Sequence, residues 1–100
     1  MQLEWSLFAL ADREAIFDYI EGDSPPAAVT VDNHIREQIE QLIAFPEIGR
    51  PGRIEGTREL VIHGTPYIAA YRIEQDSIRI LRVLHGARIW PEDMPEAAQL

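Results

Sequence analysis

The 100-residue sequence contains no cysteine, and all nine of its basic residues are arginine rather than lysine. Without cysteine the chain can form neither a disulfide nor a thiolate zinc site, which fits a cytoplasmic protein. No apolar run is long enough to cross a membrane, and residues 1–5 lack the basic start and apolar stretch of a signal peptide. We therefore expect a cytoplasmic protein that makes no use of a membrane.

Positive charge is scarce overall and unevenly distributed. The formal net charge is −8, which argues against loose, charge-driven binding to nucleic acid. Residues 1–48 carry ten acidic residues and two arginines (net −8), whereas residues 49–88 carry four acidic residues and seven arginines (net +3). Arginine suits bidentate contacts with carboxylate or phosphate. We expect the arginines of residues 49–88 to meet acidic residues of a partner protein.

Signatures of metals and cofactors are also missing. The three histidines, His34, His63 and His85, lie 22 to 29 residues apart in different predicted elements, so we expect no metal site. The loop at residues 49–56 contains three glycines, but its spacing matches neither a P-loop nor a dinucleotide fingerprint. We expect no cofactor and no small-molecule substrate.

Hydrophobic periodicity predicts the element order β-α-α-β-β-β. Residues 3–7 alternate as a strand, and a helix then runs to Gly22, which is expected to end it in the left-handed conformation. Ser24 is expected to cap a second helix that ends before Pro46. Residues 57–63, 67–73 and 77–85 are β-rich and separated by breaks of hairpin length. The residues expected on the apolar helix faces are Phe8, Ala11, Ala15, Ile16, Tyr19 and Ile20, then Val31, Ile35, Ile39, Leu42 and Ile43.

These elements predict one domain of the α+β class. The two predicted helices are joined by about four residues, and helices with so short a connection must lie antiparallel. The expected fold is an antiparallel helical hairpin packed on one face of a mostly antiparallel sheet. We assign residues 1–91 to this single domain and residues 92–100 to an acidic C-terminal tail.

Five segments, in register from Trp5 to Pro91, resemble the RelE/ParE toxin superfamily, also called plasmid stabilisation proteins. They are residues 9–12 with 18–20, then 45–52, 57–60, 70–73 and, above all, the segment Arg82-Val83-Leu84-His85-Gly86-Ala87-Arg88. The resemblance is closer to the ParE-like branch, and it implies the same β-α-α-β-β-β fold. It also implies the toxin of a type II toxin–antitoxin system, neutralised by a cognate antitoxin and directed at DNA gyrase or the ribosome.

The target decides whether this toxin is an enzyme. Cleavage of ribosome-bound RNA requires an acid, a base and cations around the phosphate. Against it, the central strand offers Ile68, Ala69 and Ala70 where RNA-cleaving relatives carry an arginine, and the chain is acidic. We therefore favour non-hydrolytic inhibition of gyrase, with a ribosome-dependent mRNA endoribonuclease as the alternative and a non-toxic protein-binding module as the second alternative. The candidate catalytic residues, if RNA is cleaved, are His85, Arg82, Arg88, Arg72 and Arg79; the residues expected to contact the target or antitoxin are Arg58, Arg72, Arg82, His85, Arg88 and Trp90.

Structural interpretations of the same residues stay open. His85 could bond to backbone at the end of its strand, and Arg82 could pair with Glu59 or Glu74 across the sheet. A strand turns alternate side chains to opposite faces, and both faces of residues 77–85 are mixed, so alternation does not assign an exposed face. Tyr67 and Tyr71 share one strand face and are expected in the core or at the antitoxin contact, and Trp90 is expected to anchor the tail.

Overall fold

The computed structural model describes residues 1–88 and residue 90. Its elements are β1 (Gln2–Trp5), α1 (Leu7–Glu21), α2 (Pro25–Glu40), the 3-10 turn η1 (Gln41–Ile43), β2 (Arg50–Pro51), β3 (Arg58–Val61), β4 (Tyr67–Ile73) and β5 (Ser77–His85). The sheet has the order β1-β5-β4-β3-β2, in which β1 is parallel to β5 and every other pair is antiparallel. The predicted α+β fold is confirmed, and β2 is a short edge strand within a segment that was expected to be only a loop.

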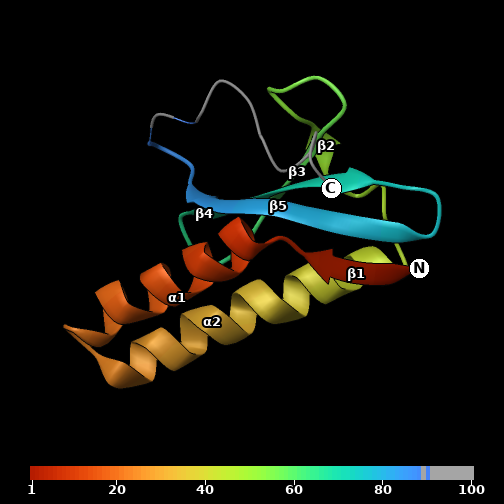
Figure 1. Cartoon of the computed structure of the whole chain (residues 1–100). Coiled ribbons are helices and arrows are strands. Elements are labelled where there is room, and N and C mark those ends of the chain that lie inside the picture. Colours follow the sequence, from red (N-terminus) through yellow and green to blue (C-terminus); the bar gives the residue numbers. More distant parts are fainter. Residues whose placement is uncertain (89, 91–100) are drawn as a thin grey trace.

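The two helices form an antiparallel hairpin that covers one face of the sheet (Figure 1). Serine caps begin both of them, as expected for Ser24: the Ser6 Oγ accepts from the Ala9 N–H at 3.0 Å, and the Ser24 Oγ accepts from the Ala27 N–H at 3.3 Å. Because Ser6 begins a helix, Leu7 is the first residue of α1 and not the last of a strand. Gly22 ends α1 with φ −56°, so the left-handed ending predicted for it is wrong.

The main core lies between the helices and the sheet. The helix face predicted for α2 is confirmed at Ile35, Ile39 and Leu42, which are fully buried, although Ile43 is exposed. In α1 the buried face differs from the prediction, because Phe8 and Tyr19 are 53% and 73% exposed. Ala9, fully buried, lets α1 approach the sheet closely instead, and Ile16 and Ile20 pack beside it.

A β-bulge explains the mixed pattern of β5. Ala70 on β4 lies opposite Arg82, but the next residue, Tyr71, lies opposite Ile80. Leu81 is therefore an extra residue, which reverses the alternation of side chains along the strand. As a result Ile78, Ile80 and Val83 all join the core beneath the helices, whereas Leu81 packs on the opposite face.

The opposite face of the sheet is covered by a smaller cluster built around Trp90. Trp90 is 8% exposed, packs with Ile68, Ala70 and Leu81, and donates from Nε1 to the carbonyl of His85 at 3.2 Å. The Arg53 guanidinium stacks on the Trp90 ring at 3.8 Å. Trp90 thus packs on the domain, and its expected role as an anchor of the tail stays a prediction, because residues 92–100 lie outside the described residues.

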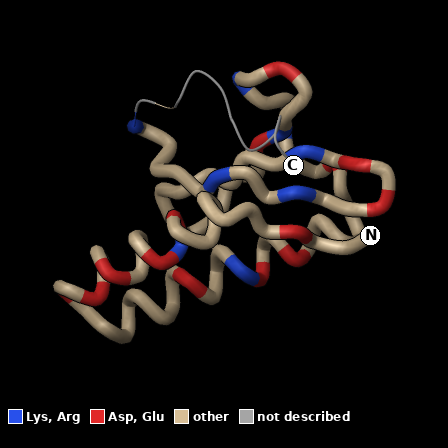
Figure 2. Tube along the Cα trace, viewed as in Figure 1, with Lys and Arg blue, Asp and Glu red and all other residues tan. Residues whose placement is uncertain are grey.

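Charge is segregated between the two layers. Figure 2 shows acidic positions along the helical hairpin, whereas most arginines lie on the sheet and its loops. The exposed acids of α1 include Glu14, Asp18 and Glu21. No helix within residues 1–88 has the length and apolar character needed to cross a membrane.

Candidate functional site

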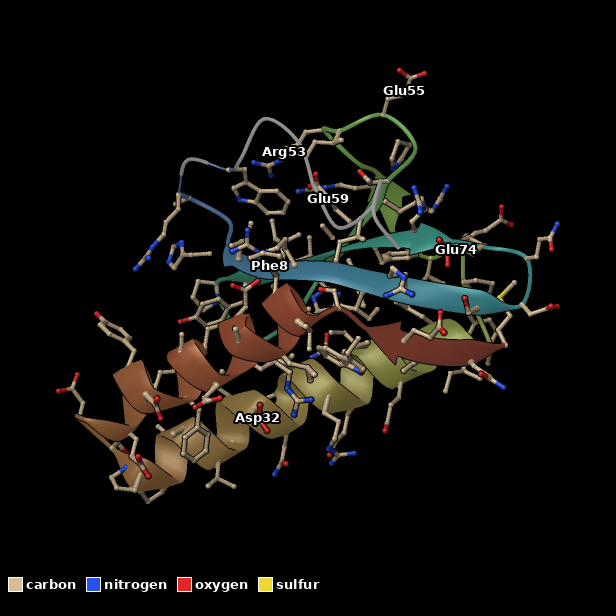
Figure 3. All side chains as sticks on the ribbon, viewed as in Figure 1. Phe8, Asp32, Arg53, Glu55, Glu59 and Glu74 are labelled. Atoms are coloured by element: carbon tan, nitrogen blue, oxygen red, sulfur yellow. The ribbon has the colours of Figure 1, made fainter. Side chains whose placement is uncertain are left out.

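Glu59 on β3 organises the arginines of the loop beside it (Figure 3). Its side chain is 3% exposed and accepts from Arg50 at 3.1 Å and from the Arg53 side chain at 3.0 Å. The Arg53 backbone N–H also donates to it at 2.8 Å. Burial would raise the pKa of Glu59, but the hydrogen bonds from Arg53 and Arg50 outweigh burial and hold the pKa below its ordinary value. Sequence reasoning did not anticipate this cluster, because its only signal is a single acid near the start of a β-rich segment.

Arg72 and Arg79, two of the catalytic candidates, are paired with acids near the β4–β5 turn. Arg72 bonds to Glu74 at 2.8 Å, and Arg79 lies 3.5 Å from Glu4 and 3.8 Å from Glu74. The hydrogen bond from Arg72, with the charges of Arg72 and Arg79, lowers the pKa of Glu74. Arg79 also precedes His85 by six residues, about 20 Å along a strand. The structure therefore does not bring these arginines to His85.

Arg58 and Tyr71 fasten the loop that precedes β2. Arg58 donates to the carbonyls of Glu47 and Gly49, at 2.9 and 2.6 Å. The Tyr71 hydroxyl donates to the carbonyl of Pro46 at 2.7 Å and accepts from the Gly49 N–H at 3.0 Å. Tyr71 is fully buried, so its expected place in the core is confirmed, and Arg58, expected to contact a partner, holds the loop.

Arg82 forms a bidentate ion pair with Asp12 of α1. The carboxylate accepts from Arg82 Nε at 2.8 Å and from Arg82 Nη2 at 3.0 Å, and it also accepts from the Val83 N–H at 2.9 Å. The side chains of Asp12 and Arg82 are only 14% and 24% exposed. The predicted partners Glu59 and Glu74 are therefore wrong, because an acid 70 residues earlier in the chain occupies this position once α1 packs on β5.

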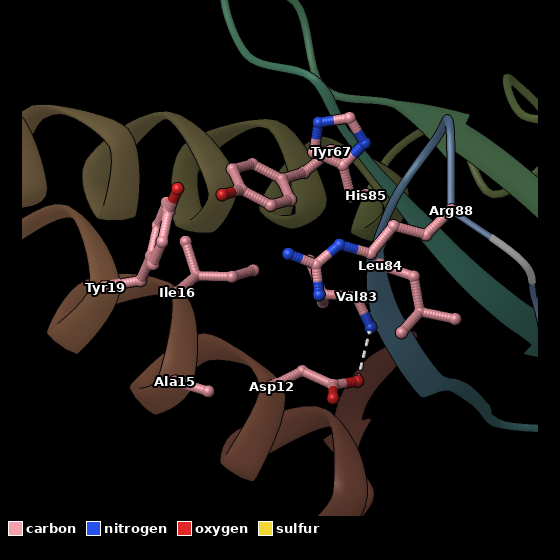
Figure 4. Close-up of a pocket in the computed structure, with 9 residues that line it drawn as sticks. All are labelled: Asp12, Ala15, Ile16, Tyr19, Tyr67, Val83, Leu84, His85 and Arg88. Carbon is pink, nitrogen blue, oxygen red and sulfur yellow. Dashed lines mark hydrogen bonds between the residues drawn. The ribbon is translucent and has the colours of Figure 1, made fainter.

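A pocket of about 300 Å³ lies between α1 and the C-terminal end of β5 (Figure 4). Two of the predicted residues, His85 and Arg88, meet there with Tyr67 of β4 and Tyr19 of α1. The remaining lining residues are Asp12, Ala15, Ile16, Val83 and Leu84. This pocket is the place where the structure gathers candidate functional residues.

His85 is oriented by the backbone and by Tyr67. Its Nδ1 accepts from the Ala87 N–H at 3.1 Å, which confirms the backbone bond considered for it. Its ring meets the Tyr67 ring edge-on, with centroids 5.8 Å apart. Tyr67 is 8% exposed and packs in the main core, as expected. Burial raises the pKa of Tyr67, although the nearby Arg88 offsets part of that effect, so its hydroxyl is protonated at neutral pH.

Arg88 differs from the other arginines of residues 49–88. The others, Arg50, Arg53, Arg58, Arg72, Arg79 and Arg82, already bond to carboxylates or carbonyls of this chain. Arg88 is exposed, its guanidinium extends over the pocket in Figure 4, and no acceptor among residues 1–88 and 90 bonds to it. The expectation that the arginines of residues 49–88 meet a partner stays a prediction, and Arg88 is the one among them that lines this pocket. In the same part of the chain, no three histidine or acidic side chains are placed to share a metal ion.

Comparison with known proteins gives consistent matches. Residues 3–90 match the family described as ParE toxin of type II toxin-antitoxin system, parDE. The chain is 44% identical over 91 residues to the inferred toxin Y4kP of Sinorhizobium fredii, covering 91% of this chain and 94% of that protein. It is 36% identical over 88 residues to toxin RelE2 of Caulobacter vibrioides, covering 88% and 98%. Among solved structures, a chain of the chromosomal ParDE TA system from P. aeruginosa has a TM-score of 0.77 and 34% identity, with 85% of this chain and 95% of that chain covered.

Proposed function

This chain belongs to the family of ParE toxins of type II toxin–antitoxin systems, and on that premise we propose that it arrests growth by inhibiting DNA gyrase rather than by cleaving RNA. Membership makes it the toxin half of such a system and implies an antitoxin as its partner. We propose that it acts in the cytoplasm, where gyrase and the antitoxin are both found.

The ion pair of Arg82 with Asp12 is the observation that best supports a non-hydrolytic mechanism. Cleavage of a phosphodiester needs cations that stabilise charge developing on the phosphate. Arg82 is the arginine nearest to His85 on the same strand, and its guanidinium already holds a carboxylate by two hydrogen bonds. Arg72 and Arg79 are likewise paired with acids. Within residues 1–88 and 90, an active site at His85 would therefore have Arg88 as the one arginine not already bonded to an acceptor of this chain.

The charge of the protein supports the same proposal. The net charge is −8, and Glu14, Asp18 and Glu21 of α1 are exposed, so the overall field opposes the approach of a polyanion such as ribosomal RNA. A protein target carries both signs of charge and is not excluded in this way. Contact and shape, rather than proton transfer, would then make the site toxic.

Two assays run side by side test this proposal. Purified toxin should reduce supercoiling by gyrase, while message on programmed ribosomes should remain intact. His85→Ala should retain inhibition of gyrase as long as the variant folds. Arg36→Gln, a half-exposed position on α2 away from the pocket, serves as the control. Cut message with unaffected supercoiling would contradict the proposal.

RNA cleavage is the second candidate, because His85, Arg88 and Tyr67 share one pocket. On that alternative His85 moves a proton, and His85→Ala in a folded protein should lose about 10²–10⁴-fold in rate. Expression without the antitoxin tests both mechanisms against a non-toxic binding module. Normal growth in the presence of soluble, folded protein would favour the binding module.

A further inference from the structure

The pocket between α1 and the end of β5 presents hydrogen-bond donors. Arg88 contributes a guanidinium, and Tyr67 contributes a hydroxyl that burial keeps protonated. The Nδ1 of His85 accepts from the Ala87 N–H, so the neutral ring carries its proton on Nε2 and donates from there. Three groups of one chemical kind thus line a single cavity.

The one carboxylate in the pocket is already bonded within the chain. Asp12 accepts two hydrogen bonds from Arg82 and one from the Val83 N–H, so its charge is neutralised within the wall of the pocket. Because Arg82 already neutralises the charge of Asp12, Asp12 does little to neutralise Arg88. The pocket is therefore rich in donors, and its unneutralised charge is that of Arg88.

The walls and the size of the pocket restrict the ligand. Ala15, Ile16, Val83 and Leu84 provide an apolar surface beside the donors. A volume of about 300 Å³ is at the lower end of the range for ligand sites. One or two side chains of a peptide fit this space, with an apolar group against the walls and an anionic group at Arg88.

The net charge of the protein separates a carboxylate from a nucleic acid. The chain carries a net charge of −8. A chain of phosphates would bring several negative charges to this acidic protein in exchange for one arginine. A single carboxylate reaches Arg88 with much less repulsion.

From these contacts we infer that the pocket binds a peptide segment of a partner protein through one glutamate or aspartate that follows an apolar residue. The carboxylate accepts hydrogen bonds from Arg88, His85 and Tyr67, and the apolar residue packs on Ile16 and Leu84. This inference does not depend on gyrase being the target, because it concerns only the chemistry that the pocket recognises.

Two dipeptides that differ by one charge test the inference. Acetyl-Leu-Glu-amide and acetyl-Leu-Gln-amide are titrated into the full chain, and the ring resonances of Tyr67, Tyr19 and His85 are followed by NMR. The Glu peptide should shift these resonances and bind at least about tenfold more tightly than the Gln peptide, as expected for a charge-assisted pair. Arg88→Gln should abolish the preference, whereas Arg36→Gln should leave it unchanged.

Three outcomes would overturn the inference: equal affinity for both peptides, no shift with either, or tighter binding of the trinucleotide UUU through Arg88. None of them bears on supercoiling by gyrase. Failure here is therefore distinguishable from failure of the proposed function.

Discussion

Arg82 and Arg88 lie six residues apart, the first within β5 and the second just beyond its end, yet the structure uses them in opposite ways. Arg82 is largely buried and binds Asp12 of α1 through two hydrogen bonds. Arg88 is exposed and faces a pocket whose one carboxylate, Asp12, is already bonded to Arg82. An arginine side chain therefore stabilises the fold at position 82 and is available to a partner at position 88. The two arginines differ because Asp12, 70 residues before Arg82 in the chain, lies beside Arg82 in the folded protein. Only the packing of α1 on the sheet brings this acid there.

Removal of Asp12 should produce the largest change in stability. Asp12→Ala leaves Arg82 without its carboxylate and the Val83 N–H without its acceptor, so the free energy of unfolding should fall by about 2–3 kcal/mol. Urea unfolding measures this difference. Asp18→Ala, an exposed position on the same helix, is the matched control and should change stability by less than about 0.5 kcal/mol. Similar values for both variants would mean that Arg82 is not part of the scaffold.

Loss of the Glu59 carboxylate should have a smaller and pH-dependent effect. Glu59→Gln removes the anion that Arg50 and Arg53 share, and both arginines are partly exposed, so we expect a loss of about 1–2 kcal/mol at pH 7. Because the folded-state pKa lies below the ordinary value of 4.5, the stabilisation is complete above that pH and is lost as the pH falls through the folded-state pKa. Unfolding at pH 7 and at pH 3 should show the two proteins converging in acid. A constant difference across this range would contradict the assignment.

A conservative change at Trp90 should have the next smaller effect. Trp90→Phe keeps an aromatic ring beside Arg53 but removes the hydrogen bond from Nε1 to the His85 carbonyl. We expect a loss of about 1 kcal/mol, measured by thermal unfolding, together with a change in the resonances of His85. Unchanged stability and unchanged His85 signals would show that this cluster does not fix the end of β5.

The fold was largely predictable because its signals are local. The cap at Ser24, the apolar face of α2 and the strands β4 and β5 all follow from spacing and propensity over a few residues. The errors arise where distant segments meet. The bulge at Leu81 depends on pairing with β4, and the partner of Arg82 depends on α1, so neither is visible in the sequence of β5.

The candidate site was predictable only in part for the same reason. His85 and Arg88 were identified from the segment at the C-terminal end of β5, residues 82–88, and the structure places both at the pocket. Arg58, Arg72, Arg79 and Arg82 were chosen with them because every arginine is equivalent in a sequence. Tyr19 was assigned to the core because its spacing places it on the predicted apolar face of α1. The sequence alone does not show that Asp12, on the same helix, faces β5 and bonds to Arg82.

The most direct test of the contrast between the two arginines is growth arrest by Arg88→Gln, expressed without antitoxin at a soluble level matched to the parent chain. The variant should unfold within about 0.5 kcal/mol of the parent, because this exposed arginine bonds to no acceptor among the described residues. Its toxicity should fall by about tenfold or more, as expected when one charged contact with a partner is lost. Full toxicity in this folded variant would contradict the assignment of Arg88 to the functional surface.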